Sequence, residues 1–257
     1  MIKPKPDRYA GLIKSDEELQ AMRKAGRELA RVREEVVRAV RPGVSTLELD
    51  RLARKRIEEL GARPAFLGYN DYPATLCTSI NEEVVHGIPN AKRRLSAGDL
   101  VSIDFGLILH GFYADTAVTV PVGELSEERK RLIEVTRRAL EVGIAAVRVD
   151  GRVGDISAAI QRFVESQSMT VVRDYTGHGI GREMHEEPKV PNYGKEGHGL
   201  RLRAGMVVAL EPMVNLGTWR TEVLEDGWTV VTADGRPSAH FEHTVALTAS
   251  GVEILTA

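Results

Sequence analysis

Apolar residues recur every three or four positions in four stretches of the chain, and this spacing predicts four amphipathic helices. The first begins at Ser15, because a serine followed three residues later by Glu18 forms a capping box. Gly61 is typical of a helix end and closes the second. The predicted helices cover residues 15–40, 45–60, 126–147 and 155–166.

An almost continuous apolar run over residues 100–109 predicts a buried strand that carries a carboxylate, Asp104, in its middle. A buried carboxylate is costly unless a cation pairs with it or coordinates it. The dipeptide at 110–111 favours a turn, so the chain is expected to return as a second strand that carries Asp115. In such a hairpin Asp104 and Asp115 lie alongside each other, within about one register step.

The acid-bearing strand recurs in the second half of the chain. Residues 94–104 align without a gap on residues 201–211, and Glu211 stands where the first copy has Asp104. Two looser correspondences extend the repeat, residues 40–47 with 149–156 and residues 115–118 with 242–245. Two halves that each direct two acids to a shared interior predict a pseudo-twofold domain with its site on the axis.

The remaining stretches are less regular. Short strands are predicted at 171–173, 205–214 and 239–247, and a hairpin over 218–232 is predicted to turn at Asp226–Gly227. Residues 175–193, which include His178 and His185, are rich in Gly and Pro, so little regular secondary structure is expected there. Aromatic residues gather within residues 65–88, which would form either a half-buried aromatic loop or one wall of a pocket.

Composition narrows the class of protein. The 257 residues include 42% hydrophobic and 28% charged residues, as in an ordinary globular protein, and the formal net charge of −2 argues against a nucleic-acid-binding surface. A single cysteine, Cys77, excludes an internal disulfide and suits a reducing compartment. Neither a signal peptide nor a membrane span is evident, so we expect a cytoplasmic protein with no membrane partner. We expect an N-terminal arm, residues 1–14, and one domain, residues 15–257.

The candidate chemistry lies in four carboxylates and one histidine set in apolar or glycine-rich surroundings. If the carboxylates converged inside the protein they would repel one another, unless a divalent cation or a shared pair of cations held them. Ligands rich in oxygen, with one imidazole and no thiolate, suit Mn, Co, Fe or Zn in a hydrolytic pair. A buried acid–imidazole network is the alternative, and it would need several Lys or Arg partners. The residues are Asp104, Asp115, His178, Glu211 and Glu242.

Other catalytic motifs are absent from the sequence. No G-x-S-x-G, H-E-x-x-H or G-x-x-x-x-G-K-[ST] motif occurs. His185 is followed by two glutamates, but Pro188 blocks the helix that a zincin motif requires. Cys77 has apolar neighbours, which favour an inert buried thiol over a nucleophile.

The segments that carry these residues resemble the signature motifs of type I methionine aminopeptidases, over nearly the whole chain. The match is carried by residues 175–193 (YTGHGIGREMHEEPKVPNY), 79–82 (SINE), 86–89 (HGIP), 104–106 (DFG), 211–213 (EPM) and 242–244 (EHT). The resemblance implies the α+β pita-bread fold, a curved antiparallel sheet flanked by helices with internal pseudo-twofold symmetry.

The resemblance further implies a metal-dependent exopeptidase that removes the N-terminal methionine from peptides and nascent proteins and favours a small second residue. Two divalent ions (Co, Mn, Fe or Zn) would activate the water that attacks the first peptide bond. Asp104 would chelate one ion, His178 and Glu211 would complete the other, and Asp115 and Glu242 would bridge them.

The resemblance also assigns catalytic and substrate-binding roles. Glu211 would shuttle a proton, His185 would hydrogen-bond the scissile carbonyl, and His86 would contact the scissile amide and steer the leaving peptide. The two histidines would share the substrate site with pocket-forming side chains, namely Phe66, Tyr69, Tyr72, Cys77, Met184 and Trp228. A monomer is expected, with the ribosome as a further partner.

Three residues depart from the family pattern and bear on the dimensions of the pocket. Met184 stands where Phe is usual, His240 where Gln is common, and Phe66 where some relatives have a smaller residue. An Xaa-Pro peptidase or a creatine amidinohydrolase of the same fold is the main rival, but these would need roughly 100 residues for an additional N-terminal domain. A non-catalytic relative is the second rival, and it would lack one or more metal ligands.

Overall fold

A computed structural model describes Tyr9 and residues 11–257. Its helices are α1 (Asp16–Ala39), α2 (Thr46–Glu59), α3 (Glu127–Ala146) and α4 (Val153–Ser166), with a short 3₁₀ helix η1 (Tyr69–Asp71). These confirm the four predicted helices to within two residues. Most of the predicted N-terminal arm lies outside the described residues, and no helix in the described part of the chain is long and apolar enough to cross a membrane.

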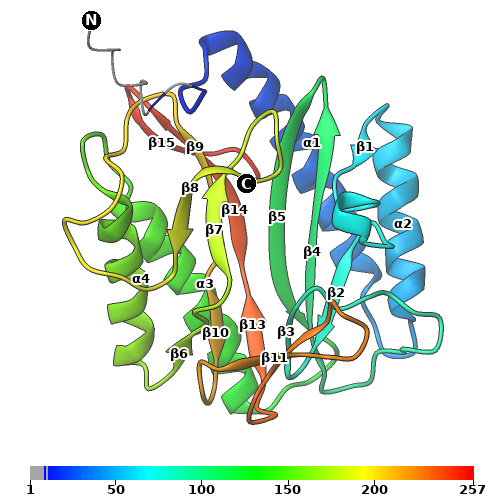
Figure 1. Ribbon diagram of the computed structural model, residues 1–257. Helices are drawn as coiled ribbons and strands as arrows, with labels where there is room; N and C mark the ends of the chain where they lie inside the picture. Colours follow the sequence, from blue (N-terminus) through cyan, green and yellow to red (C-terminus); the bar gives the residue numbers. More distant parts are fainter. Residues whose placement is uncertain (1–8, 10) are drawn as a thin grey trace, which may run out of the picture.

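The strands form one large antiparallel sheet and two small ones. The large sheet has the order β1–β4–β5–β14–β9–β7–β8, with β2 added beside β4 and β15 beside β14. Its strands are β1 (Arg63–Pro64), β2 (Cys77–Ile80), β4 (Leu100–Leu109), β5 (Phe112–Pro121), β7 (Thr176–Gly179), β8 (Glu186–Pro191), β9 (Val207–Leu210), β14 (Glu242–Thr248) and β15 (Gly251–Ile254). The small sheets contain β6 (Thr170–Val171), β10 (Met213–Asn215) and β13 (Ser238–His240), and β3 (Glu83–Val85), β11 (Thr221–Val223) and β12 (Val230–Thr232). This arrangement confirms the predicted α+β class with a curved antiparallel sheet (Figure 1).

Each half of the chain has its own hydrophobic core. In the first half α1 packs on β4 and on α2, around Leu29, Leu49 and Phe105. In the second half α3 and α4 pack against the sheet around Leu132 and Ile156. Both halves contribute strands to the same large sheet, whose order places the hairpin β4–β5 of the first half directly beside β14 of the second (Figure 1).

The structure corrects the spacing of the looser part of the repeat. Ser45 and Arg152 precede α2 and α4, and each forms a bridge to the copy of the acid-bearing segment, at Arg94 and Arg201 respectively. Both pairs are 107 residues apart, so the alignment of residues 40–47 with 149–156 was wrong by two residues. The same interval relates Gly98 to Gly205, both with φ above +90° in the turn before the strand, where a Cβ would be strained.

Several strands and one helix start differ from the predicted boundaries. The stretch 175–193 contains two paired strands, β7 and β8, rather than irregular chain. The strand predicted at 205–214 is broken at Glu211–Pro212, where proline removes a backbone donor, and the strand at 239–247 is broken at Phe241. Asp155 does not begin α4 but lies in its first turn, where its carboxylate accepts the Arg152 N–H at 2.9 Å.

Candidate metal centre and substrate pocket

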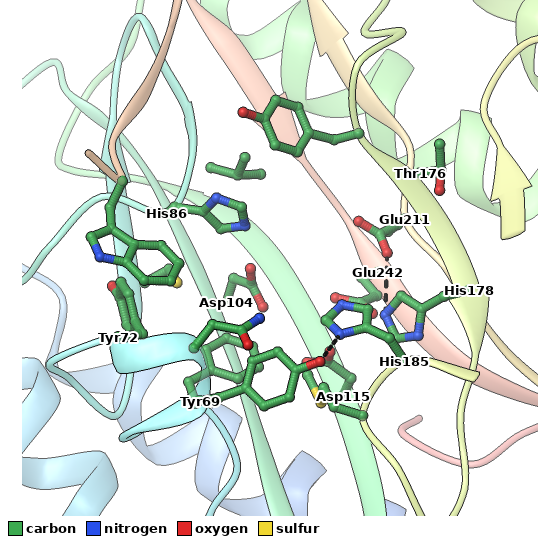
Figure 2. A pocket seen from close by; sticks show the side chains of 17 residues that line it. Tyr69, Tyr72, His86, Asp104, Asp115, Thr176, His178, His185, Glu211 and Glu242 are labelled. Carbon is green, nitrogen blue, oxygen red and sulfur yellow. Dashed lines mark hydrogen bonds and ion pairs between the residues drawn. The ribbon is translucent and has the colours of Figure 1, made fainter. Parts of the chain in front are cut away.

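Five strands or strand ends direct polar side chains into one buried cavity at the centre of the large sheet. Asp104 comes from β4, Asp115 from β5, His178 from β7, Glu242 from β14, and Glu211 from the break between β9 and β10. Figure 2 shows the four carboxylates and His178 converging. The structure therefore brings together all five predicted metal ligands.

The pairing register explains how the ligands meet. Asp104 lies opposite Ala117 on β5, and Ala117 lies opposite Glu242 on β14, so a small side chain separates two acids. Asp115 is opposite Gly106, two residues from the position facing Asp104. The expected offset of about one step was therefore too small. An offset of two places both aspartates on the same face of the hairpin, whereas an offset of one would place them on opposite faces.

No Lys or Arg in the described part of the chain forms an ion pair with these four carboxylates. One oxygen of Asp104 and one of Glu242 are buried without any hydrogen-bonding partner. Burial, and then repulsion among the acids, raises the pKa of Asp104, Glu211 and Glu242 well above their usual values. Burial raises the pKa of Asp115 to about 7, against the lowering effect of the Thr116 N–H. These features disfavour the acid–imidazole network and fit a site built for cations.

The protonation state of His178 suits a metal ligand. Its Nδ1 lies 2.9 Å from the carbonyl oxygen of Gly179, which can only accept, so Nδ1 carries the proton and the Nε2 lone pair is free. Nε2 points toward Glu211, with 3.6 Å to Oε1 (Figure 2). Burial, and then the neighbouring His185, lowers the pKa of His178 to about 4, so the imidazole is neutral at physiological pH.

The donor set fits a divalent metal. Asp115, His178 and Glu242 each offer a ligand atom, and these three atoms lie within 4.8 Å of one another. Carboxylate oxygens with one imidazole nitrogen match the preferences of Mn, Co, Fe and Zn ions. A bound cation would give a partner to the carboxylate oxygens of Asp104 and Glu242 that have no hydrogen bond.

The predicted substrate-binding residues line the same cavity, which has a volume of about 210 Å³. The aromatic stretch thus forms a pocket wall: the ring of Tyr72 meets those of Phe66 and Trp228 edge-on, with centroids 6.5 and 5.0 Å apart. The Tyr72 hydroxyl donates to the carbonyl of Leu76 at 2.9 Å, which satisfies its polar end and leaves an apolar face. All eight predicted side chains contribute: Phe66, Tyr69, Tyr72, Cys77, His86, Met184, His185 and Trp228.

Four further residues line the cavity that sequence reasoning did not assign to it: Asn70, Val85, Tyr175 and Thr176. Thr176 could have been found, because it lies two residues before His178 on β7 and so faces the same side of the sheet. Asn70, with its positive φ in η1, had no comparable signal.

His86 and His185 occupy related places in the two halves. Ser79 pairs with Ser102, and His178 pairs with Ala209, the counterpart of Ser102 in the repeat. The same 99-residue interval that separates Ser79 from His178 separates His86 from His185. Burial lowers the pKa of both histidines, to about 4 for His86, so both are neutral near pH 7.

The side chain of His185 is oriented by Tyr69, whose hydroxyl lies 2.7 Å from Nδ1 (Figure 2). When the hydroxyl donates to Nδ1, the ring proton resides on Nε2, which is then a donor toward the cavity. Cys77 is buried, and burial raises the pKa of its thiol well above the usual value, as expected for an inert thiol.

Metal affinity is expected to fall as the pH is lowered from about 8 to 6, by up to roughly tenfold per unit for each proton that the metal displaces. The reason is that the raised pKa values, including about 7 for Asp115, leave protons on the metal-free site. Titration calorimetry with Mn²⁺ in buffers of different ionisation enthalpy would measure both the affinity and the protons released. An affinity that does not change with pH would contradict this description of the site.

The comparisons with known proteins agree with this geometry. The sequence profile of metallopeptidase family M24 matches residues 20–249. The methionine aminopeptidase of Clostridium perfringens is 50% identical over 245 residues, which are 95% of this chain and 98% of that protein. The crystal structure of a methionine aminopeptidase from Thermotoga maritima superposes with a TM-score of 0.94 at 48% identity, covering 95% of this chain and 98% of that one.

A more distant structure shares the fold but little of the sequence. The prolidase of Pyrococcus horikoshii shares the fold, with a TM-score of 0.78, but only 22% of the residues, and the match covers 97% of this chain and 65% of that chain. The likeness shows a common fold and nothing about activity. The pita-bread fold predicted from the motifs is thereby confirmed. Near-complete coverage of relatives about half identical shows that this chain belongs to metallopeptidase family M24 and, within it, to the methionine aminopeptidases.

Proposed function

We propose that this chain removes the N-terminal methionine from peptides and nascent chains by hydrolysing the first peptide bond, with two divalent ions in the carboxylate cluster. The observation that carries the proposal is a buried set of four carboxylates without cationic partners, directly beside an aromatic pocket. Asp104 would hold one ion, and His178 and Glu211 would hold the other. Asp115 and Glu242 would be shared by both. When bound, the ions would supply Lewis acidity and lower the pKa of a water in the site.

The protein groups divide the remaining work. Once bound ions displace its own proton, Glu211 would accept a proton from the attacking water and pass it to the leaving amine. The Nε2–H of His185 would donate to the scissile carbonyl as negative charge develops on its oxygen. His86, a neutral imidazole in the same cavity, would contact the amide of the second residue.

The pocket would bind the methionine side chain through apolar contact. A flexible thioether fills an irregular apolar space well and contacts aromatic rings favourably. Tyr72 and Trp228 offer their rings, and Met184, buried at 3% exposure, offers a soft wall of matching chemistry. Residues 15–257 would act as one catalytic unit, a cytoplasmic monomer that meets its substrates as they leave the ribosome.

The enzyme is expected to prefer a small residue after methionine, because the second residue would lie between the proposed ions and the imidazoles of His86 and His185, which line the same cavity. We expect kcat/KM for Met-Ala-Ser to exceed that for Met-Lys-Ser by at least about tenfold, equivalent to roughly 1.4 kcal/mol of transition-state stabilisation. Product formation would be followed by chromatography after metal depletion and single-metal add-back. An Xaa-Pro peptide is the control and should not be cleaved. Equal rates on the two methionyl peptides would refute the preference.

A further inference from the structure

A second, larger cavity of about 780 Å³ adjoins the proposed methionine pocket. The two share Thr176, His178 and His185 as a common wall. In Figure 2 the shared Thr176 and His178 lie across the carboxylates from Tyr72 and His86. A substrate whose first side chain fills the aromatic pocket and whose first peptide bond meets the carboxylates can therefore continue past His185 into this second cavity.

Two of the residues that line the second cavity, Lys14 and Glu186, form an ion pair that is largely buried. Lys14, from the segment before α1, places Nζ 2.5 Å from a carboxylate oxygen of Glu186, and the two side chains are only 4% and 14% exposed. The other Glu186 oxygen accepts the backbone N–H groups of Arg182 and Glu183, at 2.8 and 3.2 Å. This carboxylate therefore fixes the turn that precedes it, and His185 with the turn.

Some of the other charged side chains around this cavity have an ion-pair partner and some do not. Arg182 pairs with Glu18 at 3.1 Å, and its guanidinium covers the ring of Phe112. Glu183 and Glu187, which flank His185 two residues to either side, are exposed, and the carboxylates of both lack a hydrogen bond or ion pair within the described part of the chain. Among the described residues that line the cavity, Lys189 is the one cation without an ion pair. The unpaired charges that line this cavity are therefore two carboxylates and one ammonium, a net negative charge.

Glu183 stands two residues before His185, whose Nδ1 lies 2.7 Å from the Tyr69 hydroxyl. Burial, and then the charges of Tyr113 and Glu183, raises the pKa of Tyr69, the residue that holds His185. Glu183 and His185 line the second cavity together, and His185 also lines the first.

We propose that the second cavity binds the third and following residues of the substrate, and that Glu183 and Glu187 select a basic residue at the third or fourth position. The inference rests on the proposed function, because only a peptide cut after its first residue would extend from the aromatic pocket past His185. Remote binding of this kind raises kcat/KM for longer substrates. Each exposed ion pair is worth about 1.4- to 5-fold.

The test compares paired pentapeptides on the metal-loaded enzyme: Met-Ala-Lys-Ser-Gly with Met-Ala-Glu-Ser-Gly, and Met-Ala-Ser-Lys-Gly with Met-Ala-Ser-Glu-Gly. In at least one pair kcat/KM should favour lysine by about 2- to 10-fold, and about 0.5 M NaCl should reduce the preference because exposed charges are screened. In the double variant Glu183→Lys/Glu187→Lys the preference should reverse, and in Glu183→Gln/Glu187→Gln it should vanish. Glu225→Lys, an exposed change at the β11–β12 turn outside this cavity, should leave it unaltered.

The neutral peptide Met-Ala-Ser-Ser-Gly separates the two proposals. If every variant cleaves it but neither lysine–glutamate pair is discriminated, or if discrimination persists unchanged in Glu183→Lys/Glu187→Lys, the charge selection is overturned while methionine removal stands. If the parent enzyme does not cleave it at all, the proposed function itself fails.

Discussion

Replacing Glu242 with glutamine is expected to lower kcat/KM on a Met-Ala-Ser peptide by at least about 10³-fold, beyond the 10- to 100-fold that loss of an outer partner of a metal ligand costs. The change removes a carboxylate that lies in line with Asp104 across the sheet. His178→Ala should act in the same direction, because it removes the one imidazole of the cluster. Steady-state assays with saturating metal would measure the loss.

The metal-free Glu242→Gln protein should nevertheless be at least as stable as the parent near neutral pH. Burial and the charges of Asp115, Glu211 and Asp104 raise the pKa of Glu242, so its ionised form is disfavoured in the folded protein and an amide relieves the repulsion. For a carboxyl whose folded pKa is raised, stability falls as the pH rises from the unfolded value toward the folded one. A urea titration of both metal-free proteins would test this. Glu222→Gln, on the exposed strand β11, is the control. A variant that retains activity, or that unfolds, would contradict the assigned role.

Replacing Lys14 with methionine is expected to lower the free energy of unfolding by about 3 kcal/mol, the lower end of the range for breaking a buried ion pair. The substitution leaves the buried carboxylate of Glu186 without its cation, although two backbone N–H groups still donate to it. Urea denaturation monitored by circular dichroism would measure the change.

The double variant Lys14→Met/Glu186→Gln should recover part of the loss, because no unpaired buried charge remains. Lys24→Met is the matched control, since Lys24 is exposed on α1 and its loss should cost less than about 0.5 kcal/mol. A loss below about 1 kcal/mol in Lys14→Met would show that the pair does not hold the His185 turn in the way described.

The local features of the fold could be predicted from the sequence because they depend on neighbours in the chain. Ser15 and Glu18 cap α1 as expected, with the Glu18 N–H donating to the serine hydroxyl at 3.2 Å. The run over 100–109 became β4, with the turn at His110 and Gly111, both at positive φ. The predicted spacing of the repeat was wrong at residues 149–156, where sequence similarity is weak. The N-cap residues Ser45 and Arg152 give the correct spacing.

The candidate ligands could also be listed from the sequence, since acids in apolar strands are costly and the repeat doubles the signal. The distances between these side chains could not be predicted from the sequence. Whether Asp104 and Asp115 share a face depends on a register of two residues, and Ala117 lies between Asp104 and Glu242 only because β5 pairs with both β4 and β14. Thr176 and Asn70 line the pocket because contacts between distant parts of the chain place them there.

The sequence by itself determined the four helices, the β4–β5 hairpin, the pseudo-twofold plan, the family and the identity of the side chains available for chemistry. Only the tertiary structure decided that β7 and β8 form within a Gly- and Pro-rich stretch, that a second cavity adjoins the pocket at His185, and that Lys14 pairs with Glu186 from 172 residues away. The physical reason is that capping and periodicity act over a few residues, whereas strand register, buried ion pairs and cavities are set by contacts between distant parts of the chain.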